Sequence, residues 1–190
     1  MKEKQNLLSV RSMVFTAIMA AVICAAAPFS IPMPLMVPVS LATFAVYLAG
    51  GLLGAKRGTL AVIVYIMIGA VGAPVFSGFT GGFAKLLGVT GGYIIGYIPC
   101  ALLTGLATDL FPKKKWALPV GMLLGTAACY LLGTVWFIIS TGSGLMSALA
   151  ACVVPFLAGD AVKIAAASAI TLPLRSRIGN MLDGRKKESI

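Results

Sequence analysis

The sequence predicts an all-α integral membrane protein with six transmembrane helices, N- and C-termini in the cytoplasm, and irregular outward loops over a ligand pocket. Three observations support this fold class. Of the 190 residues, 59% are hydrophobic and only 11% are charged, whereas soluble domains carry about 25% charged residues. The apolar residues gather in runs long enough to cross a bilayer. The basic residues gather at the ends of those runs.

Six apolar runs fit, or nearly fit, the roughly 17 to 25 residues that a membrane-spanning helix needs. We predict one membrane domain over residues 1–190, with spans over 12–29, 38–54, 58–73, 91–111, 116–139 and 156–174. The second and third runs are short for a full crossing. Helix tilt or local thinning of the bilayer is expected to absorb the difference.

The basic residues predict the orientation. Of the 15 Lys and Arg residues, all but Lys85 and Lys163 lie before the first span, between the second and third, between the fourth and fifth, or after the sixth. Positive clusters favour the cytoplasmic side, so both termini are expected there, and the net charge of +10 does not indicate nucleic acid. Lys2, Lys4 and the run ending in Ala25-Ala26-Ala27 also resemble a cleavable signal peptide. We expect this segment to be retained as the first span.

The composition excludes several kinds of site. The chain has no His, which removes the commonest metal ligand and the usual general base. Its four cysteines stand singly inside apolar runs, so no disulfide or metal framework is expected. The segment GLLGAKRGT over 51–59 lacks the spacing of a phosphate-binding loop, so no nucleotide site is expected.

Three segments on the predicted outer side are apolar but irregular. They are 28–38 with four prolines, 74–93 with a glycine repeat, and 140–155 with the sequence STGSG and Pro155. Irregular backbone at membrane depth is tolerated where it is buried in protein or lines a cavity. These loops are therefore predicted to fold over one outward-facing pocket.

The glycine repeat has the form G-x-T-G-G-aromatic and begins at Gly78 and again at Gly88. Glycine allows the backbone to approach a ligand closely. Lys85 lies between the two copies, and two interpretations stay open: a solvated loop charge, or a rim group that attracts an anion. Tyr93 ends the second copy, either as an interfacial tyrosine or, as its neighbours favour, as an aromatic wall of the pocket.

Two charges stand inside the last apolar run, in VVPFLAGDAVKIAAAS. Asp160 and Lys163 are three residues apart, which places them on one helix face. Ionisable side chains inside a bilayer are unfavourable and mark functional sites by default. The pair is either a structural ion pair or, as we favour, a polar contact for a ligand beneath the loops. Asp109, near Lys113 and its neighbours, is expected at the inner membrane surface.

The first span carries Ala17, Ala21 and Ala25 at four-residue spacing. Small residues in such a stripe let another helix backbone approach closely. The stripe is either a docking face for a partner helix or a consequence of frequent alanine.

Four motifs in order resemble the BioY family, the biotin-binding S components of energy-coupling-factor (ECF) transporters. They are PVSLATFAVYLAGGLLGAKRG, YIMIGAVGAPVFSGFTGG, GVTGGYIIGY and GDAVK. The chain departs from the family pattern at two positions. Val89 stands where proline is usual, and Ala42 stands immediately before Thr43, where the family often has glutamine.

The resemblance implies six helices in a bacterial plasma membrane, with outward loops that close over biotin. It implies two kinds of partner, a transmembrane coupling protein and two ABC-type ATPases that use the ATP, with no cofactor on this chain. It also implies that Ala17, Ala21 and Ala25 contact the coupling protein.

Biotin suits the residues that the sequence singles out. Its ureido ring offers two N–H donors and one carbonyl, so we expect Asp160 to accept from the ring and Lys163 to donate to it. The reverse, in which Lys163 binds the valerate, stays open. Five further residues complete the predicted site: Phe79 and Tyr93 against the rings, Thr80 as a hydrogen-bonding group, and Gly91 and Gly92 with backbone N–H groups near the valerate.

Three other functions are weighed against a biotin-binding subunit. The chain could bind another small vitamin, act as a membrane enzyme with Asp160 and Lys163 as acid and base, or serve only as a structural bundle. No nucleophile, metal cluster or second carboxylate accompanies the pair, so an enzyme is not expected.

Overall fold

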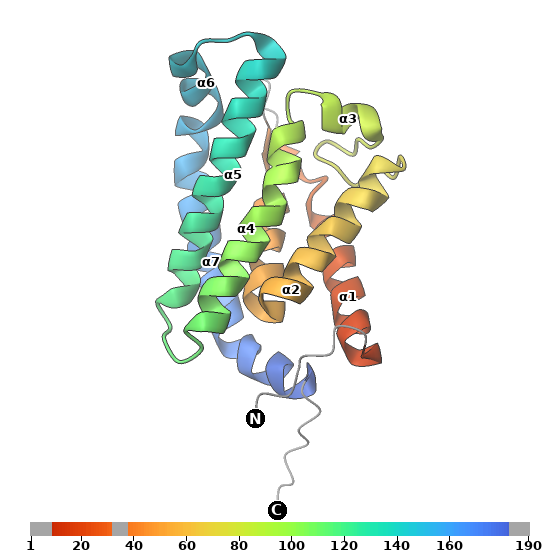
Figure 1. The fold of residues 1–190 in the computed structure, drawn as a ribbon, viewed down its shortest axis with the longest axis vertical. Helices are drawn as coiled ribbons and strands as arrows, with labels where there is room; N and C mark the ends of the chain where they lie inside the picture. Colours follow the sequence, from red (N-terminus) through yellow and green to blue (C-terminus); the bar gives the residue numbers. More distant parts are fainter. Residues whose placement is uncertain (1–8, 32–37, 183–190) are drawn as a thin grey trace, which may run out of the picture.

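The apolar runs form helices that lie mostly along the long axis of the molecule (Figure 1). The structure is a computed structural model that describes residues 9–31 and 38–182. Part of the proline-rich segment 28–38 and several basic residues near the two ends, among them Lys2, Lys4 and Arg185, lie outside the described residues. The elements are α1 (Val10–Ala26), β1 (Ser30–Ile31), β2 (Val39–Ser40), α2 (Ala42–Ala70), α3 (Phe83–Leu87), α4 (Gly91–Leu110), α5 (Ala117–Thr141), α6 (Leu145–Cys152) and α7 (Val154–Leu182).

The long helix α2 reverses direction at Gly54. This glycine has φ 78° and ψ −179°, a backbone conformation that other residues rarely adopt. The two halves then run back along each other and pack closely. A Cβ on Gly58 in the second half would lie only 2.6 Å from the carbonyl oxygen of Ala49 in the first half. They correspond to the predicted second and third spans, and the sequence LLGAKRG forms the turn between them.

Asp109 of α4 holds this turn. Its Oδ2 accepts a hydrogen bond from the backbone N–H of Ala55 at 2.9 Å, which satisfies one of the free donors at the start of the second half of α2. Its Oδ1 pairs with Arg175 of α7 at 3.2 Å. One carboxylate therefore joins three helices at the end of the molecule where α2 turns.

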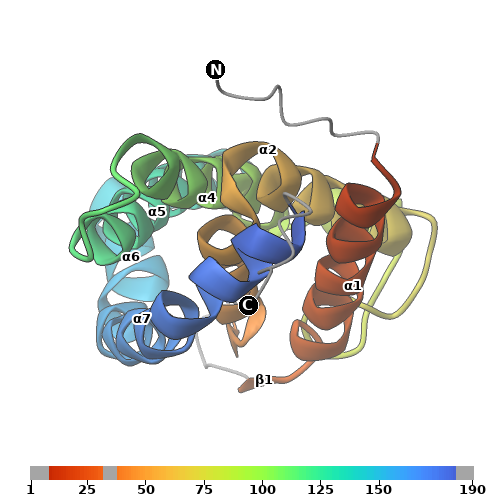
Figure 2. The ribbon, with the colours of Figure 1, turned by 90° about the horizontal axis from the view of Figure 1, so that it is seen from below.

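The helices pack in a definite order around α4. Helix α4 lies between α2 and α5, whereas α1 lies at the edge of the bundle against α2 (Figures 1 and 2). The turn of α2, the α4–α5 connection, the start of α1 and the end of α7 share one end (Figure 1). Helix α3 and the α5–α6 connection lie at the other end.

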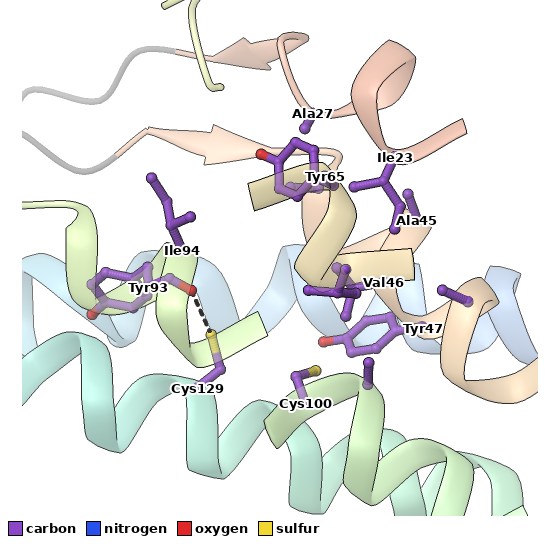
Figure 3. Packing of buried hydrophobic residues seen from close by; sticks show 14 of the residues in the cluster. Ile23, Ala27, Ala45, Val46, Tyr47, Tyr65, Tyr93, Ile94, Cys100 and Cys129 are labelled. Atoms are coloured by element: carbon purple, nitrogen blue, oxygen red, sulfur yellow. Dashed lines mark hydrogen bonds between the residues drawn. The ribbon is translucent and has the colours of Figure 1, made fainter. Parts of the chain in front are cut away.

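A buried apolar core joins α1, α2, α4 and α5. Figure 3 shows Ile23 of α1 beside Ala45 of α2, and the ring of Tyr47 near Cys100 of α4. Ile23, Val46 and Tyr47 are completely buried. Large apolar side chains such as Leu131 and Ile139 of α5 are instead exposed, as expected for helix faces that contact lipid.

The helix lengths suit a multi-pass membrane protein. Within the described residues, four helical segments are long and apolar enough to cross a membrane: α2, α4, α5 and the segment Leu145–Leu182. Helix α1 is apolar but has 17 residues. The sequence predicted six spans, and two of its ranges, 38–54 and 58–73, correspond largely to the two halves of α2, which reverses direction at Gly54.

The loops at the α3 end contain more regular structure than the sequence predicted. The glycine repeat encloses the short helix α3, and α6 occupies part of the segment 140–155. Strands β1 and β2 pair antiparallel, with Ser30 opposite Ser40. Local hydrogen bonds therefore satisfy much of the backbone where irregular loops were expected.

Candidate functional site

Asp160 and Lys163 lie side by side near the start of α7. The Nζ of Lys163 is 2.9 Å from Oδ1 of Asp160, and their side chains are only 11% and 5% exposed. The spacing i, i+3 in the helix brings them together, as the sequence predicted. Such a pair is stable in an apolar bundle when further hydrogen bonds satisfy both groups.

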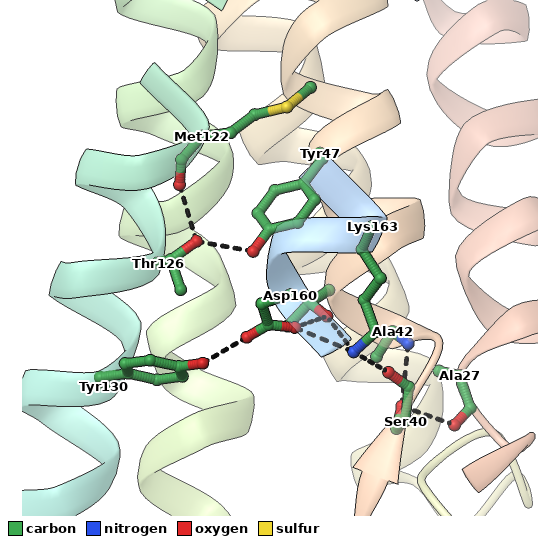
Figure 4. A network of polar contacts seen from close by, with 10 residues as sticks. Ala27, Ser40, Ala42, Tyr47, Met122, Thr126, Tyr130, Asp160 and Lys163 are labelled. Atoms are coloured by element: carbon green, nitrogen blue, oxygen red, sulfur yellow. Dashed lines mark hydrogen bonds and ion pairs between the residues drawn. The ribbon is translucent and has the colours of Figure 1, made fainter. Parts of the chain in front are cut away.

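The ammonium of Lys163 is fully satisfied by the protein. Besides Asp160, it donates to the backbone carbonyl of Ser40 at 2.8 Å (Figure 4) and to Oγ1 of Thr43 at 3.0 Å. An ammonium has three N–H donors, so each donor has one acceptor. A ligand that accepts a hydrogen bond from Lys163 must therefore replace one of these three groups.

The carboxylate of Asp160 has other partners of its own. Its Oδ2 accepts a short hydrogen bond from the hydroxyl of Tyr130 in α5 (Figure 4), and its Oδ1 lies 3.4 Å from the hydroxyl of Thr43. A carboxylate can accept about four hydrogen bonds. Oδ2 therefore retains capacity for a donor from a ligand.

A pocket opens above this pair. It encloses about 630 Å³ of empty space, including space open to solvent. Aromatic and polar side chains from α2, α4, α5 and α7 line it, together with the loops. The lining residues are Pro38, Ser40, Ala42, Thr43, Tyr65, Ser77, Lys85, Thr90, Tyr93, Ile94, Tyr97, Cys129, Tyr130, Phe156, Asp160 and Lys163.

Three of the predicted site residues, Asp160, Lys163 and Tyr93, meet in this pocket. Tyr93 lies in the first turn of α4 and is 8% exposed. Its hydroxyl donates to the carbonyl of Cys152 at 3.2 Å. Tyr93 thus lines the pocket and also anchors the end of α6 to α4.

Gly91 and Gly92 do not line the pocket. Both are buried in the first turn of α4, where a Cβ on Gly91 would clash with the carbonyl of Leu86 and one on Gly92 with Cβ of Trp136. These glycines allow the backbone to pack against α5 and the preceding loop. Tyr93 follows them directly in the first turn of α4.

Phe79 and Thr80 also lie away from the pocket lining. Phe79 has φ 57° and is 61% exposed, and its ring contacts the edge of Phe29 with centroids 5.5 Å apart. The hydroxyl of Thr80 donates to the carbonyl of Ser77 at 2.9 Å. Both residues shape the loop that carries Ser77.

Lys85 lines the pocket, and so does Ser77. Sequence reasoning left two interpretations of Lys85 open, and its position fits a group at the pocket rim. The Oγ of Ser77 is buried without a hydrogen-bond partner among the described residues. A cation and an unpaired hydroxyl at the same pocket suit an anionic group.

Several lining residues were not singled out from the sequence. Tyr130, Tyr97 and Ser40 are uncharged polar residues in or beside apolar runs, where they give a weak local signal. Tyr97 follows Tyr93 by four residues in GVTGGYIIGY, so helical spacing could have placed it on the same face. No local pattern could have paired Tyr130 with Asp160, which come from different helices.

Ala17, Ala21 and Ala25 are all exposed on the outer side of α1, whereas Met19 and Ile23 of the same helix are buried. The stripe is thus open to a partner helix.

Within the described ranges, no group of His, Cys, Asp or Glu side chains is placed to bind a metal ion.

Comparison with known proteins identifies the family of this chain. The model of the BioY family matches residues 1–180. The chain belongs to the BioY family. A biotin transporter BioY of Thermotoga maritima is 37% identical over 165 residues, covering 87% of this chain and 96% of that protein. A probable biotin transporter BioY of Pyrococcus horikoshii is 40% identical over 131 residues, covering 69% and 76%.

The BioY fold is also found in a solved structure. The crystal structure of an S-component for biotin from an ECF-type ABC transporter matches with a TM-score of 0.82 and 29% identity, over 90% of this chain and 94% of that one. The two BioY relatives are named as transporters. The structural match extends over almost the whole chain.

Proposed function

We propose that this chain is the biotin-binding S subunit of an ECF-type transporter. The observation that carries the proposal is the buried Asp160–Lys163 pair at the base of a pocket in a BioY-family fold. The names of the relatives and of the matching structure support biotin as the ligand. The chain is a binding subunit and not an enzyme, with ATP hydrolysed by partner proteins.

The ureido ring of biotin suits the inner part of the pocket. One ring N–H would donate to Oδ2 of Asp160, which retains capacity beside Tyr130. The ring carbonyl would accept from Lys163 in place of Thr43. The Thr43 hydroxyl is the easiest of the three acceptors to replace, because a side-chain hydroxyl rotates more freely than the backbone carbonyl of Ser40.

The valerate suits the outer part of the pocket. Lys85 lines this pocket, and the Ser77 hydroxyl there has no partner within the described part of the chain, so these two groups would bind the carboxylate. Lys163 is already neutralised by Asp160, which would repel a second carboxylate. Lys163 therefore serves the ureido ring.

The chain would cross a bacterial plasma membrane six times, through α1, the two halves of α2, α4, α5 and α7. The basic residues at the α2 turn and the α4–α5 connection would face the cytoplasm. The pocket would then open outward.

The partners would be a transmembrane coupling protein and two ABC-type ATPases. The exposed stripe of Ala17, Ala21 and Ala25 would contact the coupling protein, since small residues let helices approach closely. This subunit would bind biotin, and the partners would supply the energy.

Ligand-dependent thermal stabilisation across a panel of vitamins tests the proposed ligand. A ligand at about 100 times its Kd stabilises a protein by about 2.7 kcal/mol, so biotin should raise the unfolding temperature by several degrees while riboflavin and thiamine leave it unchanged. Native mass spectrometry of the purified protein should also retain bound biotin. Stabilisation by another vitamin and none by biotin would refute the assignment.

A further inference from the structure

Ser40 connects the candidate ligand site to the end of helix α1. Its backbone carbonyl accepts from Lys163 at 2.8 Å. Its hydroxyl donates to the carbonyl of Ala27 at 3.2 Å and accepts from the N–H of Ala42 at 2.8 Å (Figure 4). One residue therefore contacts α7, the start of α2 and the last turn of α1.

The contact with Ala27 satisfies a group that a helix end leaves free. Ala27 follows the last residue of α1, and the last carbonyls of a helix have no partner within the helix. Ala27 is completely buried, so its carbonyl depends on a protein donor. The Ser40 hydroxyl supplies that donor.

We propose that Ser40 is a positioning residue that orients Lys163 for the ligand and transmits occupancy of the pocket to the last turn of α1. The inference rests on the proposed function and adds a connection to it. Ser40 lines the pocket, whereas no residue of α1 does. Packing of a ligand on Ser40 therefore restrains Ala27 through the hydroxyl.

The connection gives the site an effect on a distant face. Helix α1 carries the exposed stripe of Ala17, Ala21 and Ala25. If a ligand restrains the end of α1, a partner that binds α1 and the ligand influence each other's affinity to the same extent.

A second route from the loops to α1 makes the proposal testable. The carbonyl of Pro28 accepts from the N–H of Gly78 at 3.0 Å. Ser77, which precedes Gly78 in the chain, lines the pocket. Ligand binding could restrain α1 through this contact without Ser40. The two routes differ in their dependence on the Ser40 hydroxyl.

Hydrogen exchange with and without saturating biotin distinguishes the routes, in Ser40→Ala, Ser40→Thr and the wild-type protein. In the wild type, biotin should slow exchange at Ala27 and Phe29 at least about threefold, as well as in residues 43–48 beside the pocket. Ser40→Ala should lose the effect at Ala27 and Phe29 but retain it in 43–48, and Ser40→Thr, which keeps a hydroxyl, should retain both. We also expect biotin affinity to fall about threefold to tenfold in Ser40→Ala and to stay near wild type in Ser40→Thr.

Ser9→Ala is the matched control. The Ser9 hydroxyl accepts from the N–H of Ser12 at the opposite end of α1, so this variant loosens α1 without touching Ser40. It should keep the biotin effect at Ala27 and Phe29. An unchanged effect in Ser40→Ala, or none in the wild type, overturns the inference while biotin binding still stands. Absence of biotin binding by the wild type in calorimetry refutes the proposed function itself.

Discussion

Thr43 shares its hydroxyl oxygen between the two charged groups of the site. It accepts from Lys163 at 3.0 Å and lies 3.4 Å from Oδ1 of Asp160. If the ureido carbonyl replaces this hydroxyl, Thr43→Val removes a group that the ligand has to displace in any case. Biotin affinity in Thr43→Val should stay within about threefold of wild type, measured by calorimetry. A loss of about a hundredfold would show that Thr43 binds the ligand directly.

Asp160 should behave differently from Thr43. Asp160→Asn keeps the shape and removes the negative charge of a group that accepts hydrogen bonds from Lys163 and Tyr130 and, in the proposed pose, from the ureido ring. Hydrogen bonds to charged groups contribute about 1.5 to 3 kcal/mol, so biotin affinity should fall at least about tenfold, the equivalent of 1.4 kcal/mol. Wild-type affinity in this variant would leave only a structural ion pair.

Lys85 and Lys163 can be separated with a biotin whose valerate is blocked as an amide. If Lys85 binds the valerate carboxylate, Lys85→Gln should weaken biotin several-fold and leave the amide unaffected. Lys163→Met should weaken both ligands by the same factor. If Lys163→Met instead impairs biotin much more than the amide, Lys163 binds the valerate and the pose is reversed.

The turn of α2 depends on one carboxylate from α4. Asp109 caps the backbone at Ala55 and pairs with Arg175, whose side chain is 27% exposed. Loss of a helix cap lowers stability by about 0.5 to 2 kcal/mol, whereas an exposed ion pair contributes about 0 to 1 kcal/mol. Asp109→Ala should therefore lower the unfolding temperature in detergent more than Arg175→Ala does. Equal losses would mean that the ion pair, and not the cap, holds the turn.

The proposed docking face, the exposed alanine stripe of α1, lies apart from the pocket lining. Ala21→Trp adds bulk to an exposed position, so it should impair assembly with the coupling protein and biotin uptake while biotin affinity of the isolated subunit stays within about twofold. Leu131→Trp, at an exposed position of α5 away from α1, is the matched control. An equal loss of affinity in isolated Ala21→Trp would assign the stripe to the fold.

Much of the helical organisation follows from hydropathy, but the smaller elements do not. The apolar runs over 91–111 and 116–139 correspond closely to α4 and α5. The boundary predicted at 54 falls on the turn of α2, since a glycine followed by Lys56 and Arg57 interrupts the run. Helices α3 and α6 were missed because each is short and lies among glycines or small residues that also suit loops.

The candidate site was only partly predictable from the sequence. Asp160 and Lys163 stand out because a charge is rare in an apolar run. Ser40, Thr43 and Tyr130 complete their hydrogen bonds from other helices and loops, and uncharged hydroxyls in such runs carry no comparable signal. Phe79 and Thr80 belong to the first copy of the glycine repeat, whose glycines serve turns and close packing of the backbone.

At the scale of the whole molecule, the orientation in the membrane remains a prediction that labelling can test. The four cysteines are free, so they can be replaced before a new cysteine is introduced at Lys114 in the α4–α5 connection or at Ser143 in the α5–α6 connection. An impermeant thiol reagent added to intact cells should label the cysteine at 143 and not the one at 114. Efficient labelling at 114 contradicts the six-span topology.

The mutual compensation of Asp160 and Lys163 has an electrical consequence for the whole molecule. A membrane potential of 100 mV acts on each unit charge that crosses it with about 2.3 kcal/mol. Because the two side chains form a close pair without net charge, the potential does no net work on them if the inner pocket changes its depth in the bilayer. Any reorientation of this subunit during transport would carry these two charged residues through the membrane field electroneutrally.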